Sequence, residues 1–184
     1  MAGASVTNNQ ANFTKSGQYV KLPSGLFGSY TAVSVEAWVT TGVAKTGVNS
    51  RIFQCGASNT SSANSILMWR GPRTGSTETY FTASWFDANL VGSLISTQVR
   101  FDSQTNAHVV MTVSEGDYAK FYINGWLEGT SNAVVKPIPP QNFFYIGTGM
   151  SNSLIGSVNE FRIWGGALSA TDIATRYSQG PGET

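Results

Sequence analysis

The chain has 184 residues, of which 41% are hydrophobic and 12% aromatic, and this suits one domain with a two-layer core. Only 11% of the residues are charged, the net charge is +1 and the lysines and arginines are scattered, so there is no reason to expect nucleic acid or an anionic membrane as a partner, since either needs a concentrated basic patch. Cys55 is the single cysteine, so an internal disulfide is excluded, and no apolar run is long enough to cross a bilayer.

Short strands separated by turns are predicted along the first half of the chain. A turn at Ser16-Gly17 divides residues 11–22 into two of them. The clearest alternation, over residues 31–40, places two sets of side chains on opposite faces: Val33, Val35, Ala37 and Val39 on one, and Ser34, Glu36, Trp38 and Thr40 on the other. Further strands are predicted at 51–55, 65–70 and 78–86, and we expect Cys55 to be a small buried thiol.

The second half continues the same pattern. One strand is predicted at 94–99, within a weakly patterned section, and 108–114 pairs with 119–124. Asn124-Gly125 predicts a type I′ turn, because both residues tolerate the positive φ that this turn needs. Trp126 begins the return strand, and a short strand follows at 143–147.

The stretch 154–169 ends the sandwich. Its alternation places Ser157, Asn159, Phe161 and Ile163 opposite Val158, Glu160, Arg162 and Trp164. Phe161 and Ile163 would then face a core, while Glu160 and Arg162 can pair on the other face. Gly165-Gly166 stops the strand, and Ser169 with Asp172 predicts a capping-box start for a short helix over 170–177.

Several motifs carry a family resemblance. The last strand and the turn after it match a known closing pattern at Gly156, Val158, Glu160, Phe161, Arg162, Ile163, Trp164, Ala167, Leu168, Ser169 and Ile173. Residues 35–39, 108–110, 121–125 and 143–147 match internal strands of the same family, in the same order. The chain thus resembles the laminin G-like, concanavalin A-like jelly rolls over residues 11–177. The resemblance implies an all-β antiparallel β-sandwich with one short C-terminal helix, in a single domain over residues 1–184.

Catalytic machinery is not expected. Laminarinase-type glycoside hydrolases of this fold carry Glu-x-Asp-x-(x)-Glu on one strand, so that two carboxylates flank the glycosidic bond. The nearest match, Glu115-Gly116-Asp117, lacks a third carboxylate and is typical of a turn. His108 is the only histidine, so a Ser-His-Asp triad or a histidine metal site would have to form around it. We therefore expect no enzyme and no catalytic residues.

Calcium is the one cofactor that the resemblance raises. Members of the family often hold calcium with an aspartate of the last strand, where this chain has Asn159. The loss of one carboxylate weakens a calcium site. Asp87 and Asn89 follow a predicted strand and are candidate ligands of a rim site, with a turn-capping role for Asp87 as the alternative. We expect no cofactor, with calcium possible at Asp87, Asn89 and Asn159.

Sandwiches of this family bind glycans through aromatic faces flanked by polar side chains. For Trp69 and Trp85 the alternative is core packing, and Trp38 and Trp164 lie in family core motifs and are assigned to packing. Trp126, just past the hairpin tip, is the tryptophan that we expect to be exposed. The candidate ligand-binding residues are Trp69, Arg70, Trp85, Asp87, Asn89 and Trp126.

The resemblance implies a non-enzymatic, lectin-like adhesion module that binds carbohydrate at a cell, matrix or virion surface. The alternative is a protein-binding structural module, such as a viral capsid or tail decoration protein. Expected partners are a glycan or a surface protein, with an oligomer or assembly possible and without nucleic acid or membrane insertion. The N-terminus shows no signal-peptide pattern, and the expected location is extracellular, cell-surface or virion.

Overall fold

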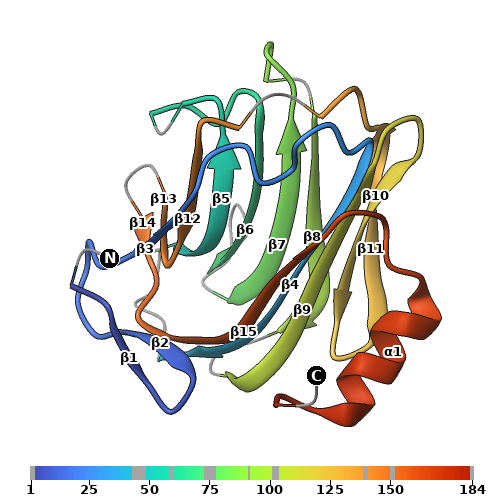
Figure 1. The fold of residues 1–184 in the computed structure, drawn as a ribbon. Helices are drawn as coiled ribbons and strands as arrows, with labels where there is room; N and C mark the ends of the chain where they lie inside the picture. The colour runs from blue at the N-terminus through green and yellow to red at the C-terminus, as the bar shows by residue number, and fades with distance from the viewer. Residues whose placement is uncertain are drawn as a thin grey trace.

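The computed structural model describes residues 3–42, 49–58, 60–72, 78–90, 92–100, 104–138, 141–149 and 152–182. Two antiparallel sheets pack face to face, and one helix lies at the C-terminal end of the described residues (Figure 1). The predicted antiparallel β-sandwich with a short C-terminal helix is therefore confirmed. In the part of the chain that the structure describes, no helix is long and apolar enough to span a membrane.

The larger sheet has seven strands in the order β1-β2-β15-β4-β9-β10-β11. The smaller has six, in the order β3-β12-β5-β6-β7-β8. The strands of the larger sheet are β1 (Ser5–Thr7), β2 (Gln10–Phe13), β15 (Gly156–Trp164), β4 (Ala32–Thr41), β9 (Gln104–Ser114), β10 (Tyr118–Ile123) and β11 (Trp126–Val134). Those of the smaller are β3 (Val20–Leu22), β12 (Phe143–Ile146), β5 (Ser50–Gly56), β6 (Ser65–Pro72), β7 (Thr79–Phe86) and β8 (Gly92–Arg100). A separate hairpin of β13 (Thr148–Gly149) and β14 (Asn152–Ser153) packs against β5.

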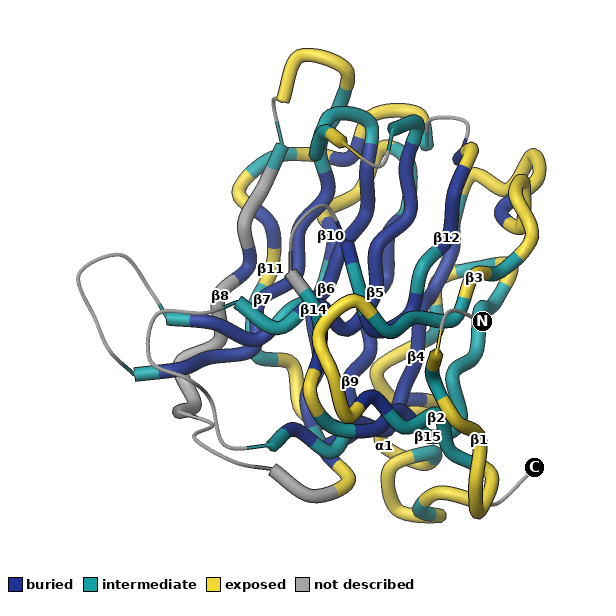
Figure 2. The backbone as a smooth tube through the Cα atoms, turned by 90° about the vertical axis from the view of Figure 1, so that its left-hand side faces the viewer, coloured by how far each residue is buried: buried dark blue, intermediate teal, exposed yellow. Residues whose placement is uncertain are grey.

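The core lies between the two sheets and takes alternate residues from the central strands. Val33, Val35, Ala37 and Val39 of β4 face it, as the alternation predicts, together with Phe81, Ala83 and Trp85 of β7. Cys55 is fully buried there, and burial raises the pKa of its thiol. Figure 2 shows buried backbone along the middle of both sheets and exposed backbone in the connecting loops. Burial of this apolar surface is the main stabilising contribution.

Strand β15 departs from strict alternation. Val158 pairs with Val39 and lies in the core, but the register against β4 shifts between Asn159 and Arg162. Glu160 takes a φ of 49° at this shift, after which Phe161 also packs on the core. The prediction that placed Val158 on the face opposite Phe161 is therefore wrong. A β-bulge inserts an extra residue and resets which side chains point inward.

Helix α1 (Ala170–Gln179) begins where predicted and extends two residues beyond the predicted end at 177. Its first turn is a capping box: the Asp172 amide donates to Ser169 Oγ, and the Ser169 amide donates to the Asp172 carboxylate. Ile173 is its buried residue and packs on Val110 and Tyr122, which lie on the outer face of the larger sheet. One side of this sheet therefore faces the core and the other is partly covered by α1.

A buried carboxylate joins three strands on this outer face. Glu36 of β4 is 0% exposed; its Oε1 lies 2.9 Å from Nε2 of His108 in β9, and its Oε2 accepts from Trp164 Nε1 of β15 at 2.8 Å. Arg162 Nη1 lies 3.8 Å from Oε1. Burial by itself raises the pKa of Glu36, but the hydrogen bonds to His108 and Trp164 and the positive charge of Arg176 outweigh it. The pKa therefore lies below its usual value of 4.5.

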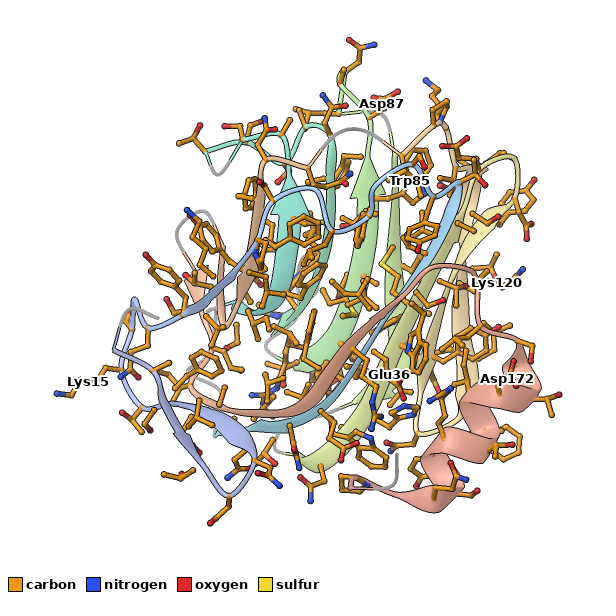
Figure 3. All side chains as sticks on the ribbon, in the orientation of Figure 1. Lys15, Glu36, Trp85, Asp87, Lys120 and Asp172 are labelled. Atoms are coloured by element: carbon orange, nitrogen blue, oxygen red, sulfur yellow. The ribbon has the colours of Figure 1, made fainter. Side chains whose placement is uncertain are left out.

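Aromatic rings connect this carboxylate to α1. The ring of His108 lies 4.8 Å from that of Trp38 and 6.1 Å from that of Tyr177 in α1, to which it is inclined by only 18°. The Arg176 guanidinium sits 4.0 Å from the centre of the Trp164 ring. Figure 3 shows Glu36 on the side of the sandwich where α1 lies. The packing role predicted for Trp38 and Trp164 is confirmed, and both rings help to hold α1 in place.

We expect Glu36→Gln to lower the free energy of unfolding at neutral pH by about 2 kcal/mol, because an amide NH2 then replaces one of two accepting oxygens and faces a donor. The wild-type carboxylate stabilises the fold at pH values above its unfolded pKa. This contribution is lost as the pH falls through the lower folded pKa. Urea unfolding between about pH 3 and 7 should therefore show the two proteins converging in stability on acidification. A gap that stays constant over that range would contradict the stabilising role of the ionised group.

Substitutions at two glycines distinguish the effect of a steric clash from the effect of backbone strain. Gly156 and Gly166 have similar φ values of 147° and 144°, but a Cβ at Gly156 would clash with the carbonyl oxygen of Thr40, whereas the space around Gly166 is open. We expect Gly156→Ala to cost at least about 2 kcal/mol more than Gly166→Ala, because only the first displaces the neighbouring strand. Urea unfolding of both variants measures the difference. Equal losses would show that strain alone decides the effect.

Candidate functional site at the β10–β11 hairpin and helix α1

Two of the predicted ligand-binding residues are packed inside the protein. Trp85 is 4% exposed and belongs to the core, as its packing alternative requires. Arg70 is 1% exposed; its Nη1 donates to the Gly42 carbonyl at 2.9 Å and its Nη2 to Thr79 Oγ1 at 3.1 Å. Neither side chain is presented to a ligand in this conformation, so a binding role is not supported for either.

Asp87 stabilises its own loop. Its Oδ1 accepts from the backbone amide of Asn89 at 2.9 Å, and its Oδ2 lies 2.6 Å from Lys136 Nζ. The first bond is the turn-capping alternative that the sequence left open. Asn89 is exposed in the same loop. Figure 3 shows Asp87 at the end of the sandwich away from α1.

The three calcium candidates do not share one element. Asp87 and Asn89 follow β7 of the smaller sheet, whereas Asn159 lies in β15 of the larger sheet, paired with Gln10 and Trp38. Within the described ranges, no group of three or more His, Cys, Asp or Glu side chains is placed to hold a metal ion. The described residues therefore offer no cluster of acidic side chains for the calcium ion that was considered possible, and the calcium site stays a prediction.

Trp126 is 75% exposed at the start of β11, as predicted. An open pocket of about 220 Å³ lies beside it, with Tyr177 of α1 in its lining. Tyr177 is 39% exposed. Figure 1 shows α1 next to β10 and β11, although these elements are far apart in the sequence. We call this the Trp126 pocket, and it is lined by Asn124, Gly125, Trp126, Ala174 and Tyr177.

Local sequence explains the shape of the hairpin tip. Asn124 and Gly125 have φ values of 50° and 82°, which is the predicted type I′ pattern. Asn124 is anchored to His108 twice: its amide donates to the His108 carbonyl at 2.8 Å, and its Oδ1 accepts from the His108 amide at 3.0 Å. Gly125 allows close approach of α1, since a Cβ there would lie 3.1 Å from Tyr177 Cδ1. The hairpin tip and α1 therefore both rest on His108.

The Trp126 pocket is suited to stacking rather than to proton transfer. Its lining contains two aromatic side chains, Trp126 and Tyr177, and one side chain with a hydrogen-bonding amide, Asn124. Its described lining contains no carboxylate and no histidine side chain. Sequence reasoning identified Trp126 but missed Tyr177. The contact between them depends on where α1 docks, and no local pattern carries that information.

The last candidate, Trp69, is half-buried on the outer face of the smaller sheet. The Arg51 guanidinium lies 5.1 Å from the centre of its ring. It belongs to the other sheet and is not part of the Trp126 pocket. The six predicted binding residues are therefore distributed over the core, a rim loop and two separate surfaces.

The fold is shared with solved structures of low sequence identity. A heptameric SAP-like pentraxin from Limulus polyphemus superimposes with a TM-score of 0.64 at 18% identity, covering 89% of this chain and 78% of the pentraxin. Domain 4 of an extracellular GH43 arabinanase from Geobacillus stearothermophilus gives 0.66 at 20% identity, covering 90% and 75%. The binding domain of botulinum neurotoxin serotype G gives a TM-score of 0.70 at 14% identity. The superposition covers 96% of this chain but only 44% of the neurotoxin chain. These similarities concern the fold alone.

Family membership rests on a match along most of the sequence. No curated protein sequence matches the chain. The family model of the concanavalin A-like lectins and glucanases matches residues 14–174, which include the strand of Glu36, the strand of His108 and the closing strand with Trp164. Three of the motifs that suggested the resemblance thus meet at the buried carboxylate. The chain belongs to the concanavalin A-like lectin/glucanase superfamily.

Proposed function

We propose that the protein is a non-enzymatic, lectin-like module that binds carbohydrate in the Trp126 pocket and serves in adhesion at a cell, matrix or virion surface. The observation that carries the proposal is the exposed Trp126 indole beside a pocket whose lining includes Tyr177. Sugar rings have apolar C–H faces that pack against aromatic rings, while their hydroxyl groups need polar partners. A pocket of this size suits one or two terminal sugar units.

The polar side of the pocket is consistent with this ligand. Asn124 uses its Oδ1 to accept from the His108 backbone, which fixes the orientation of the amide. Its Nδ2 group can then donate to a hydroxyl at the pocket edge. Tyr177 is held by its stacking on Trp38 and His108. The side chains of Asn124 and Tyr177 are therefore preorganised, which reduces the entropy lost on binding.

Similar structures support a carbohydrate ligand by analogy. The arabinanase domain was solved in complex with arabinotriose. The ligand-binding domain of botulinum neurotoxin serotype D, at 17% identity and a TM-score of 0.68, was solved with N-acetylneuraminic acid. These ligands belong to those proteins. They make a saccharide the first ligand to test for this one.

The carboxylates nearest to a catalytic pattern have structural roles, which supports the non-enzymatic proposal. Glu115 Oε1 accepts from the Ile138 amide at 2.9 Å. Asp117 accepts from the Tyr118 amide at 2.7 Å and lies 3.0 Å from Lys120 Nζ. The hydrogen bond from Lys120 lowers the pKa of Asp117. Both groups stabilise the turn between β9 and β10 and do not flank a cleft among the described residues.

A protein partner is the second candidate function. Leu127 is 52% exposed directly after Trp126, so the start of β11 exposes two large apolar side chains. Contiguous apolar surface is typical of protein interfaces, whereas a glycan site needs polar groups around its aromatic rings. A capsid or tail decoration protein, or another surface partner, would use Trp126 and Leu127 together.

We expect Trp126→Ala to weaken glycan binding at least about tenfold, because it removes the main stacking surface. A glycan array with and without calcium identifies the sugar class, and calorimetry with the best ligand measures the loss. Tyr118→Ala is the matched control, because Tyr118 is an aromatic residue of β10 that is 44% exposed and lies outside the pocket lining.

The variants separate the two candidate functions. Leu127→Ala should leave glycan affinity nearly unchanged but weaken a protein contact across β11. A folded protein that binds no glycan on the array would overturn the lectin proposal and leave the protein-binding function. Glycan binding that is unaffected by Trp126→Ala would show that carbohydrate is bound elsewhere.

A further inference from the structure

The outer face of the smaller sheet contains buried polar side chains. Arg51 and Gln54 of β5 are 6% and 0% exposed. Gln54 points away from the core, since its neighbours Phe53 and Cys55 point into it. The register against β6 shifts between Arg51 and Phe53, and Ile52 is in the core as well, so Arg51 lies on the same face as Gln54. Trp69 of β6 pairs with Arg51 across the sheet and is half-buried on this face. These residues are distant in the fold from the Trp126 pocket, which belongs to the larger sheet and α1.

The polar atoms of Arg51 and Gln54 converge under the β13–β14 hairpin. A Cβ at Gly149 of β13 would lie 3.0 Å from Arg51 Nε and would clash with Gln54 Oε1. Both atoms are therefore close to one point beneath Gly149. The Arg51 guanidinium also lies 5.1 Å from the centre of the Trp69 ring. We call Arg51, Gln54, Trp69 and Gly149 the Arg51 cluster.

These buried polar atoms have no hydrogen-bond partner. Nε and Nη1 of Arg51, and both Oε1 and Nε2 of Gln54, are unpaired in the structure as described. Among the described residues, no carboxylate forms an ion pair with Arg51. Burial lowers the pKa of Arg51 to about 10, so the group is still protonated at neutral pH. The cluster therefore contains a buried positive charge for which the described part of the chain supplies no counter-charge.

Such an arrangement is costly unless something compensates it. A buried unpaired polar group destabilises the folded state, and an uncompensated buried charge does so more strongly. The contact between Arg51 and the Trp69 ring offsets only part of this. Water can satisfy hydrogen bonds but cannot supply the opposite charge. An anion supplies both.

We propose that the Arg51 cluster is a second binding site, specific for the carboxylate of an acidic sugar. The planar guanidinium of Arg51 binds a carboxylate through two parallel hydrogen bonds. The Gln54 amide both donates and accepts, which matches a neighbouring hydroxyl. The accessible part of the Trp69 ring stacks on the sugar ring. The ligand class is therefore a uronic acid or another sugar that carries a carboxylate.

Access requires the β13–β14 hairpin to move away from β5, because Arg51 is almost completely covered. The described part of the hairpin has only two residue pairs, Thr148 with Ser153 and Gly149 with Asn152. The hydroxyls of Thr148 and Ser153 are 3.4 Å apart, which is a long contact. Displacing the hairpin breaks the bond from the Gly17 amide to Ser153 Oγ, and the bound carboxylate supplies the partners that the closed form lacks.

The test uses the folded full chain and ¹H–¹⁵N NMR spectra that resolve the Arg51 Nε–H and the Trp69 indole N–H. Glucuronate and galacturonate are titrated to about tenfold above a millimolar Kd, with glucose and galactose as the matched neutral sugars. We expect saturable shifts of both signals with the uronates only. Acetate should shift the Arg51 signal weakly; binding of acetate as tight as that of the uronates would overturn the assignment to a sugar.

Variants locate the site. Arg51→Met should weaken uronate binding at least about tenfold and raise the melting temperature of the free protein, because it removes an uncompensated buried charge. Lys21→Met is the control: it removes an exposed cation from the same face, where Lys21 pairs with Tyr145, the neighbour of Gln54. It should leave binding unchanged. Gln54→Leu provides a second test if Arg51→Met fails to fold.

The outcome is independent of the Trp126 pocket. Trp126→Ala should bind uronates as the wild type does, so failure of the lectin proposal would not affect this one. A folded wild-type protein whose Arg51 signal is unchanged by millimolar uronate would overturn the proposal. Equal losses in Arg51→Met and Lys21→Met would show that general positive charge, rather than the Arg51 cluster, attracts the ligand.

Discussion

One buried carboxylate organises the larger sheet and everything attached to its outer face. Glu36 is in contact with His108 and Trp164, so three strands meet at a single ionised group that is completely excluded from water. A buried charge of this kind is tolerated only when its partners are in place, which makes the geometry around it demanding. The rings of His108 and Trp38 then provide the surface on which Tyr177 lies. The Trp126 pocket is thus positioned by an interaction that lies outside its own lining.

Much of the fold follows from local patterns in the sequence. The alternation of β4 and the Asn124-Gly125 turn predicted their structures correctly, because each is determined by residues that are adjacent in the chain. The bulge in β15 was missed, since the positive φ of Glu160 arises from its pairing with β4 and not from a turn-forming residue. The β13–β14 hairpin was missed because two-residue strands are too short to show a period.

The candidate sites were harder to predict than the fold for a physical reason. Both faces of the central strands are buried, so alternation does not tell which tryptophan or arginine is accessible. Trp85 and Trp126 look alike in sequence, yet one is 4% and the other 75% exposed. Tyr177 and Arg51 gave no signal at all. Tyr177 reaches the pocket through a docked helix, and Arg51 stands out because the described residues offer it no carboxylate.

The position of β15 in the larger sheet has a consequence for how the protein reaches its native state. This strand lies between β2 and β4, so two strands from the beginning of the chain are hydrogen-bonded to one from its end. The bond between Trp164 and Glu36 spans 128 positions. Pairings of such high sequence separation form slowly, because the chain loses the entropy of closing a long loop before the stabilising contacts are made. Until the last strand arrives, β4 remains an open edge in the middle of an incomplete sheet, and the nascent protein is most prone to aggregation at that stage.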